Sequence, residues 1–222
     1  DNGNAESGLT LVGNNRAGSF DLLARAGNIT QTGRLRATNL TAETKGLNAT
    51  QTFNDTDVNT AVLTSRKGDI TLNDRDGLTV TATTASTTVG NATITSYAAG
   101  MTSNNGIAEA DMLLTGDNSA NTYNLIAHGG NITEIGTTLQ GQTLNATNTN
   151  LNGTIDIYNA DYTTANLITN KGDITYKDTD GFTATADSGD ASTATVTLES
   201  GATVVGTASD NGNPESGITL VG

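Results

Sequence analysis

One stretch decides how this chain is organised: residues 1–13 read Asp1-Asn2-Gly3-Asn4-Ala5-Glu6-Ser7-Gly8-Leu9-Thr10-Leu11-Val12-Gly13. Residues 210–222 repeat it with two differences, since Pro214 replaces Ala5 and Ile218 replaces Leu9. A looser copy lies midway, at 105–116. The sequence therefore predicts two tandem units, 1–103 and 104–209, and the start of a third at 210–222. Repeats on this scale are typical of an array or a solenoid.

The composition favours β-structure. Thr, Asn and Gly dominate the 222 residues, aromatic residues are 4%, and the chain has one Pro and no Cys. The apolar residues are mainly Ile, Val, Leu and Ala in short alternating runs, which is typical of strands. Disorder is the alternative for so polar a chain, but the alternation and the repeat favour an ordered structure.

The charge narrows the range of partners. A net charge of −13 disfavours nucleic acid and anionic membrane as partners. No apolar run approaches the length of a membrane span, so we expect no membrane insertion. The absence of Cys excludes a disulfide framework but is compatible with a location outside the cell. Because the sequence begins inside a repeat, we interpret it as a segment of a longer protein.

A finer period lies within each unit. Gly27, Gly46, Gly68 and Gly90 precede apolar runs at intervals of about 20 residues. A coil of that length holds three short strands and their turns, as in a parallel β-helix, and five such coils fill one unit. An antiparallel sandwich is the alternative, because Asp76-Gly77, Asn105-Gly106 and Asp180-Gly181 could form hairpin turns. The nested periods favour an all-β parallel solenoid.

Alternation along the runs predicts which side chains face the interior. The expected strands are 9–12, 20–24, 28–32, 40–44, 47–52, 58–64, 69–72, 78–84 and 92–97, then 123–127, 131–135, 154–158, 167–169, 173–176, 182–186 and 193–198. The residues expected to point inward are Ile29, Ile70, Leu72, Ile132, Ile174, Val196 and Leu198.

Three recurring phrases carry a family resemblance. They are Gly-Asn-Ile-Thr at 27–30 and 130–133, Gly-Asp-Ile-Thr at 68–71 and 172–175, and Asp-Gly-Leu-Thr-Val-Thr-Ala at 76–82. Strung at this spacing, they resemble the filamentous-haemagglutinin-type repeats of large bacterial exoproteins exported by two-partner secretion. The resemblance covers the whole chain. It implies a right-handed parallel β-helix that serves as an adhesin shaft outside the cell.

Two acidic loops are the candidate metal sites. Asp74-Arg75-Asp76-Gly77 and Asp178-Thr179-Asp180-Gly181 each place two carboxylates beside a glycine turn, which suits calcium. The further ligands of an EF-hand are not in register, and the glycine-rich nonapeptide of calcium-binding β-rolls is absent. The alternative is a plain turn with Asp as the local turn-former. Calcium is the cofactor that these loops would take.

Asn-x-Thr sequons are candidate glycosylation sites. They occur at Asn28, Asn39, Asn48, Asn54, Asn91, Asn131, Asn145 and Asn152. About five sequons would arise by chance in a chain so rich in Asn and Thr, so a role in turns is the alternative.

The sequence thus predicts a structural protein: a segment of an extracellular adhesin shaft or matrix fibre that mediates surface attachment or cohesion between cells. The expected partners are further units or copies of itself end to end, and cell-surface glycans. A calcium- or glycan-binding module is the first alternative. A β-helical carbohydrate-active enzyme is the second, although no nucleophile–base set can be built around His128, the single histidine.

Overall fold

In the computed structural model, residues 8–97, 111–136, 138–189, 192–201 and 217–221 are described, and they form strands and turns with no helix. The unit boundaries predicted after residues 103 and 209 lie outside these ranges. Within them, no helix is long and apolar enough to cross a membrane. The strands are β1 (Leu9–Leu11), β2 (Asn15–Arg16), β3 (Ser19–Ala24), β4 (Ile29–Gln31), β5 (Leu35–Thr44), β6 (Gln51–Ser65), β7 (Ile70–Asp74), β8 (Leu78–Thr84), β9 (Ala92–Ser96), β10 (Met112–Leu114), β11 (Asn118–Ala127), β12 (Ile132–Glu134), β13 (Leu139–Leu151), β14 (Ile155–Asn170), β15 (Ile174–Asp178), β16 (Phe182–Asp187), β17 (Val196–Ser200) and β18 (Ile218–Leu220).

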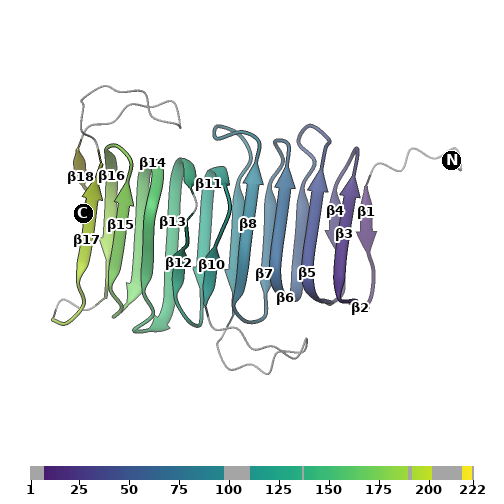
Figure 1. Cartoon of the computed structure of the whole chain (residues 1–222), viewed down its shortest axis with the longest axis horizontal. Coiled ribbons are helices and arrows are strands. Elements are labelled where there is room, and N and C mark those ends of the chain that lie inside the picture. The colour runs from purple at the N-terminus through teal and green to yellow at the C-terminus, as the bar shows by residue number, and fades with distance from the viewer. Residues whose placement is uncertain (1–7, 98–110, 137, 190–191, 202–216, 222) are drawn as a thin grey trace, which may run out of the picture.

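These strands wind into a parallel β-solenoid (Figure 1). Every strand pairing among the described residues is parallel, and most join residues 19 to 23 positions apart, such as Ile70 with Ala92 and Met112 with Ile132. The predicted parallel solenoid with coils of about 20 residues is confirmed. The antiparallel sandwich is excluded for the described chain, because none of its pairings is a hairpin.

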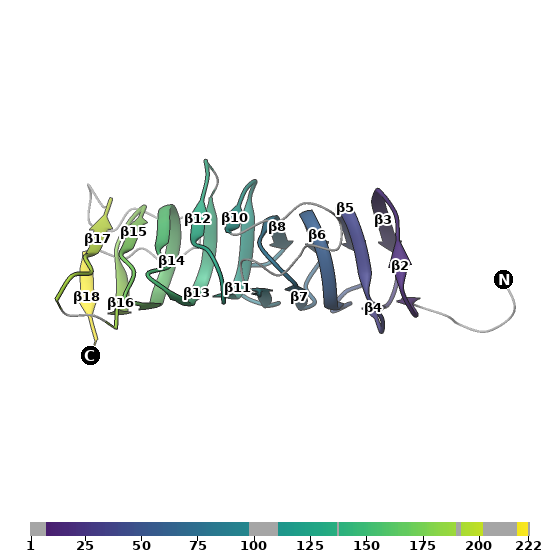
Figure 2. The same cartoon turned by 90° about the horizontal axis from the view of Figure 1, so that it is seen from below.

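Two ladders of paired residues run along the solenoid. The first ladder joins Leu9, Ile29, Gln51, Ile70, Ala92, Tyr123, Leu144, Ala165, Ala184 and Leu220. The second ladder joins Leu78, Met112, Ile132, Ile155, Ile174 and Val196. Figure 2 shows the two ladders on opposite sides of the coil, with β8, β10, β12, β15 and β17 in one row and β4, β7, β11, β13, β16 and β18 in the other.

Residues that correspond in the repeat fall on opposite ladders. Ile70 lies in the first ladder and its counterpart Ile174 lies in the second. From Leu9 the first ladder makes four steps to Ala92, and the chain then goes on to Met112, the counterpart of Leu9, on the other side. Each unit therefore contains about four and a half coils, fewer than the five expected, and successive units face opposite ways.

The interior is a stack of aliphatic residues that alternate with half-exposed polar ones, as in β8, where Leu78, Val80 and Ala82 are buried. Five of the seven residues predicted to point inward are fully buried: Ile29, Ile70, Leu72, Ile132 and Ile174. The prediction was wrong for Val196, which is 41% exposed, and Leu198 is only partly buried. Both belong to β17, and within the described chain no strand pairs with its outer edge.

The corners of the coils explain the recurring phrases. Asn28 Oδ1 accepts a hydrogen bond of 2.9 Å from the backbone N–H of Thr50, one coil further on. Asp173 Oδ1 does the same for the N–H of Thr195 at 2.7 Å. The Asn or Asp of each Gly-Asn/Asp-Ile-Thr phrase thus pairs a corner N–H that the sheet leaves without a partner, and it ties one coil to the next.

Candidate cation site at a buried carboxylate corner

The two acidic loops lie at equivalent corners of the solenoid, and their carboxylates point into it. A third buried aspartate belongs to the strand one coil earlier in each unit. The corner of the first unit contains Asp57 of β6 with Asp74 and Asp76, and the corner of the second contains Asp161 of β14 with Asp178 and Asp180. All six residues are at most 4% exposed. Each loop is a bend that follows a strand, and its acids are interior groups rather than surface ones.

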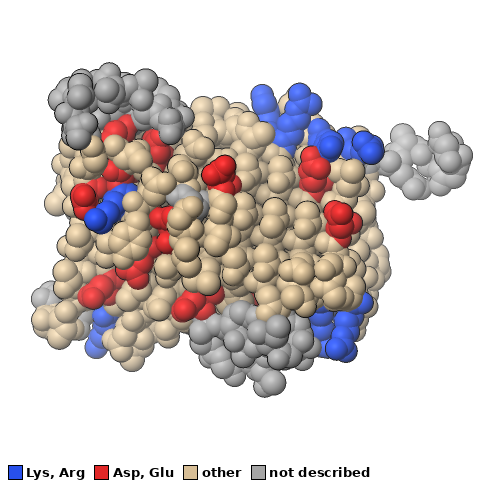
Figure 3. Space-filling view, viewed as in Figure 1, with Lys and Arg blue, Asp and Glu red and all other residues tan. Residues whose placement is uncertain are grey.

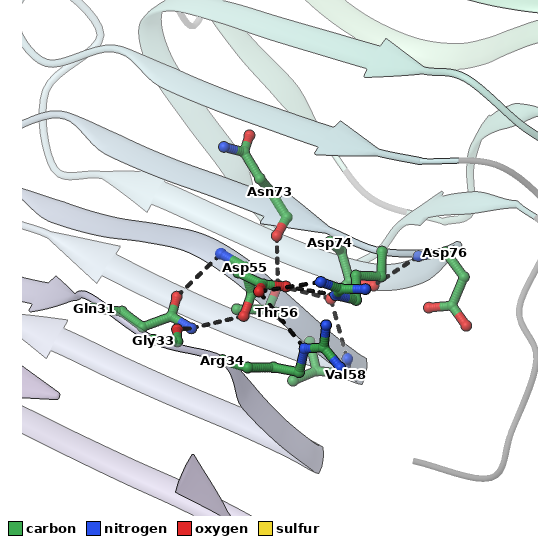
Figure 4. Close-up of polar contacts among 10 residues, drawn as sticks. Gln31, Gly33, Arg34, Asp55, Thr56, Val58, Asn73, Asp74 and Asp76 are labelled. Carbon is green, nitrogen blue, oxygen red and sulfur yellow. Dashed lines mark hydrogen bonds and ion pairs between the residues drawn. The ribbon is translucent and has the colours of Figure 1, made fainter. Parts of the chain in front are cut away.

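In the first unit, Asp74 is held by three donors (Figure 4). Its Oδ2 accepts bonds from Thr56 Oγ1 at 2.7 Å and from the Val58 N–H at 3.0 Å, and its Oδ1 accepts from the Asp76 N–H at 3.3 Å. Burial nevertheless raises the pKa of Asp74 well above its ordinary value, because desolvation disfavours the charged form more than these bonds favour it.

In the second unit, Asp178 has donors in the same arrangement. Its Oδ2 accepts from the Tyr176 hydroxyl at 2.7 Å and from the Tyr162 N–H at 3.1 Å, and its Oδ1 accepts from the Asp180 N–H at 3.2 Å. The hydroxyl comes from Tyr176 because Ala160 stands where the first unit has Thr56. Burial raises the pKa of Asp178 to about 8.

Only the second corner brings three acids together among the described residues. One carboxylate oxygen each from Asp161, Asp178 and Asp180 lies within 4.8 Å of the others. Asp74 and Asp76 belong to no such group. The sequence prediction thus identified two members of the second corner and missed Asp161. The signal that could have found it is the 104-residue offset between Asp57 and Asp161, at which both units keep an acid.

The two corners differ in their surroundings. Arg75 lies in the first loop and binds Asp55, with Nε–Oδ1 at 2.5 Å and Nη2–Oδ2 at 3.2 Å. Arg34 approaches Asp55 at 3.6 Å (Figure 4). The hydrogen bond to Asp55 is the main reason that the pKa of Arg75 is raised, and the charges of Asp57 and Asp74 add to it. Arg75 is therefore within the electrostatic reach of the buried acids.

In the second unit all three of these charged residues are replaced by neutral ones. Thr179 stands in place of Arg75, Asn159 in place of Asp55, and Thr138 in place of Arg34. Asn159 Nδ2 donates to Thr138 Oγ1 at 3.2 Å, so a neutral hydrogen bond replaces the ion pair. The second corner thus keeps its acids without the neighbouring arginine.

This loss of cations extends over the whole second unit. Residues 1–103 contain eight Lys or Arg and nine Asp or Glu, whereas residues 104–209 contain two and twelve. On the face shown in Figure 3, most Lys and Arg side chains lie over the N-terminal half and most acids over the C-terminal half. The −13 charge is therefore concentrated in the second unit.

The eight predicted glycosylation residues fall into two groups. Asn28, Asn39, Asn48, Asn54 and Asn152 are exposed, and Asn91, Asn131 and Asn145 are half-buried. Asn48 and Asn152 have φ of 70° and 63°, which fits the turn role. Asn145 joins an asparagine ladder: Asn145 Nδ2 donates to Asn124 Oδ1, and Asn166 Nδ2 donates to Asn145 Oδ1, both at 2.8 Å. Glycan attachment stays a prediction.

His128, the single histidine, lies at the surface. Its ring stacks on Tyr97 with centroids 5.3 Å apart, and its Nδ1 is 2.8 Å from Thr149 Oγ1.

Comparison with protein-family models, with curated proteins and with solved structures gave no match. The parallel β-solenoid is compatible with the β-helical repeats that the sequence resembles, and the chain is assigned here to an architecture rather than to a family.

Proposed function

We propose that this chain is a structural segment of an extracellular, repetitive β-solenoid shaft, either the stalk of an adhesin or a strand of a matrix fibre. The proposal rests on the unbroken first ladder, which links Leu9 to Leu220 through nine parallel pairings and passes through both units. At one strand spacing of about 4.8 Å per pairing, this is a rod of about 43 Å. Such a rod separates a binding element from the surface that carries it.

The mechanical basis of the shaft is the continuity of backbone pairing and core. Each coil is hydrogen-bonded to its neighbours, and buried side chains such as Ile70, Leu72 and Ile94 stack along the axis. Because each coil contacts only the coils beside it, units can be added without changing the cross-section. Length is then set by the number of units.

The ends of the rod support a role for end-to-end partners. An apolar groove at the last described coil is lined by Ala184, Val196, Leu198, Ile218 and Leu220. Residues 210–222 repeat residues 1–13, and in the proposed shaft a further unit of the same polypeptide covers this groove. Stacking of separate copies is the other form of the same proposal.

Two measurements test the shaft. Native material under denaturing conditions should give a polypeptide far heavier than 22.6 kDa if the units are covalent, or 22.6 kDa chains from an intact fibre if copies stack. In solution scattering, tandem versions of two, four and six units should lengthen by about 22 Å per unit at constant cross-section. A stable monomer of 22.6 kDa, or tandem versions that collapse into compact particles, would overturn the proposal.

The adhesive role needs a separate test. Removing units in pairs from the surface-displayed protein should reduce cell attachment. The binding element carried by the shaft, tested by itself, should bind its receptor as before. Equal attachment at all lengths would argue against a spacer. Recognition of cell-surface glycans and the absence of enzymatic activity stay predictions; a glycan array and a reducing-sugar assay address them.

A further inference from the structure

The second corner concentrates charge in an unusual way. Asp161, Asp178 and Asp180 are 1%, 3% and 4% exposed, and their nearest oxygens lie within 4.8 Å of one another. Three ionised carboxylates at this separation repel strongly in a poorly solvated site, so a buried cluster of this kind requires protons or a cation.

Asp180 points to a ligand. Its side chain is 96% buried, its carboxylate faces the other two, and neither of its oxygens meets a hydrogen-bond donor. The fully buried hydroxyl of Tyr162, from the strand that carries Asp161, also lacks a hydrogen-bond partner. A buried carboxylate without any donor is costly, and a bound cation would satisfy both of its oxygens.

The first unit supplies an internal comparison. Its three acids have Arg75 beside them, and the charges of Asp57 and Asp74 raise the pKa of that arginine. At the second corner Thr179 stands in place of Arg75, and Asn159 stands in place of Asp55, the partner of that arginine. The second corner therefore keeps its acids, although the counterpart of Arg75 is neutral.

We propose that the corner formed by Asp161, Asp178 and Asp180 binds one divalent metal ion, Ca²⁺ by preference, beside a loop in which Thr179 replaces Arg75. This inference is independent of the proposed shaft function.

The ligand chemistry favours Ca²⁺. All the ligand atoms are hard oxygens, which select Ca²⁺ or Mg²⁺ over softer metals. Oxygens on opposite sides of Ca²⁺ are about 4.6–5.2 Å apart and those around Mg²⁺ about 4.0–4.2 Å. The three oxygens lie within 4.8 Å of one another, a separation that both ions allow. A buried site made of three carboxylates favours Ca²⁺, because Mg²⁺ gives up its water reluctantly and is usually held by one or two carboxylates.

Terbium(III) alone is the first probe, because it substitutes for Ca²⁺ and its emission is excited by a nearby tyrosine. Tyr176 donates to Asp178 at 2.7 Å and is therefore the sensitiser. The full chain, purified with a chelator, should show saturable emission on adding terbium, and Ca²⁺ should displace it. At a hundred times its Kd, Ca²⁺ should raise the Tm by several degrees.

Matched variants locate the site. Asp180→Asn should weaken terbium binding at least tenfold without unfolding the chain, because the Asp180 side chain accepts no hydrogen bond. Asp161→Asn should do the same. Asp76→Asn, the counterpart of Asp180 in the first unit, should leave the affinity within twofold of the wild type, with circular dichroism to confirm that each variant is folded.

Three results would overturn the proposal. They are the absence of saturable emission, an equal loss of affinity in Asp76→Asn and Asp180→Asn, and a Tm that Ca²⁺ leaves unchanged while Asp180→Asn raises it. The last result would mean that shared protons neutralise the corner.

Discussion

At the scale of single residues, the buried aspartates Asp74 and Asp178 each accept hydrogen bonds from one hydroxyl and two backbone N–H groups. The residue that provides the hydroxyl differs between the two units. The hydroxyl of Thr56 reaches Asp74 from the preceding coil, and the hydroxyl of Tyr176 reaches Asp178 from the same strand. Leu72 occupies the position of Tyr176 in the first unit. Because a buried carboxyl needs its bonds completed, the two units preserve the donor rather than the residue.

The raised pKa of Asp74 predicts a dependence of stability on pH. A carboxyl group whose pKa is higher in the folded state binds its proton more tightly there. Its contribution to stability is therefore fully present below the unfolded pKa of about 4 and is lost as the pH rises through the raised folded value. The free energy of unfolding, measured by urea titration from pH 4 upward, should fall more steeply in the wild type than in Asp74→Asn.

Asp21→Asn serves as the control, because Asp21 is exposed on β3 and its loss removes one surface charge. Identical slopes for the wild type and Asp74→Asn would mean that Asp74 does not titrate in this range. All titrations should be run with a chelator, so that metal binding elsewhere does not contribute.

Truncation of Ile70 tests how much a single core side chain contributes to the free energy of unfolding. Ile70 is 1% exposed and lies in the first ladder between Gln51 and Ala92. Truncation to Ala leaves a cavity that the neighbouring coils cannot fill, so Ile70→Ala should lower the free energy of unfolding by about 2–5 kcal/mol. Val62→Ala, at a side chain 38% exposed, should cost clearly less. A loss below about 0.5 kcal/mol for Ile70→Ala would place it at the surface.

At the scale of elements, what the sequence predicts well is the coil. The glycines before Ile29, Ile70 and Ala92 lie at corners, and the alternating runs after them are strands. Such features depend only on neighbours along the chain. The 15 residues of β6 and 16 of β14 were expected as separate short strands. β13 was not expected, because polar strand residues that alternate with Ala or Gly give little hydrophobic signal.

The buried carboxylate corner could be predicted only in part. An Asp-x-Asp-Gly loop indicates a turn whether its acids face water or the core. Asp161 joins Asp178 only because β14 and β15 pair in one particular register. The ion pair of Arg75 with Asp55, and the Asn159–Thr138 hydrogen bond found in the second unit, likewise join residues of different coils. Local motifs therefore do not reveal contacts between coils, which join residues about 20 positions apart.

Gly68 lies at a corner where two adjacent coils pack closely, and this packing can be tested by substitution. A Cβ at this position would lie 2.1 Å from the carbonyl oxygen of Ala49, on the coil before it. Since that atom belongs to the backbone, Gly68→Ala must push two coils apart and should lower the free energy of unfolding by about 1–3 kcal/mol or more. Gly18→Ala, with no atom within 4 Å of the added Cβ, should change it little. Equal effects in a thermal melt would refute close packing at this corner.

At the scale of the whole molecule, the half coil in each unit has a consequence for assembly. Ile70 and Ile174 occupy the same place in the repeat and lie on opposite sides of the rod. One unit therefore turns whatever follows by about half a revolution, and two units restore the original direction. In the proposed shaft, the same surface would therefore recur on the same side of the rod at every second unit.

This half-turn predicts a distance that spin labels can measure. The chain has no Cys, so spin labels attach only at Cys residues introduced in pairs. Asp69 and Thr164 each precede a residue of the first ladder and are separated by four coils, or about 19 Å along the axis. Asp69 and Asp173 are separated by about four and a half coils, or about 22 Å, and lie on opposite sides.

The distance for Asp69→Cys with Asp173→Cys should exceed that for Asp69→Cys with Thr164→Cys by more than one strand spacing of about 5 Å, because it crosses the roughly 10 Å between facing sheets and both labels project outward from opposite faces. If each unit instead contained a whole number of coils, labels at Asp69 and Asp173 would share a side, and the two distances would differ by one strand spacing at most. Double electron–electron resonance resolves the two cases. The result decides whether the 104-residue unit repeats the same surface at each copy or alternates it from one side of the rod to the other.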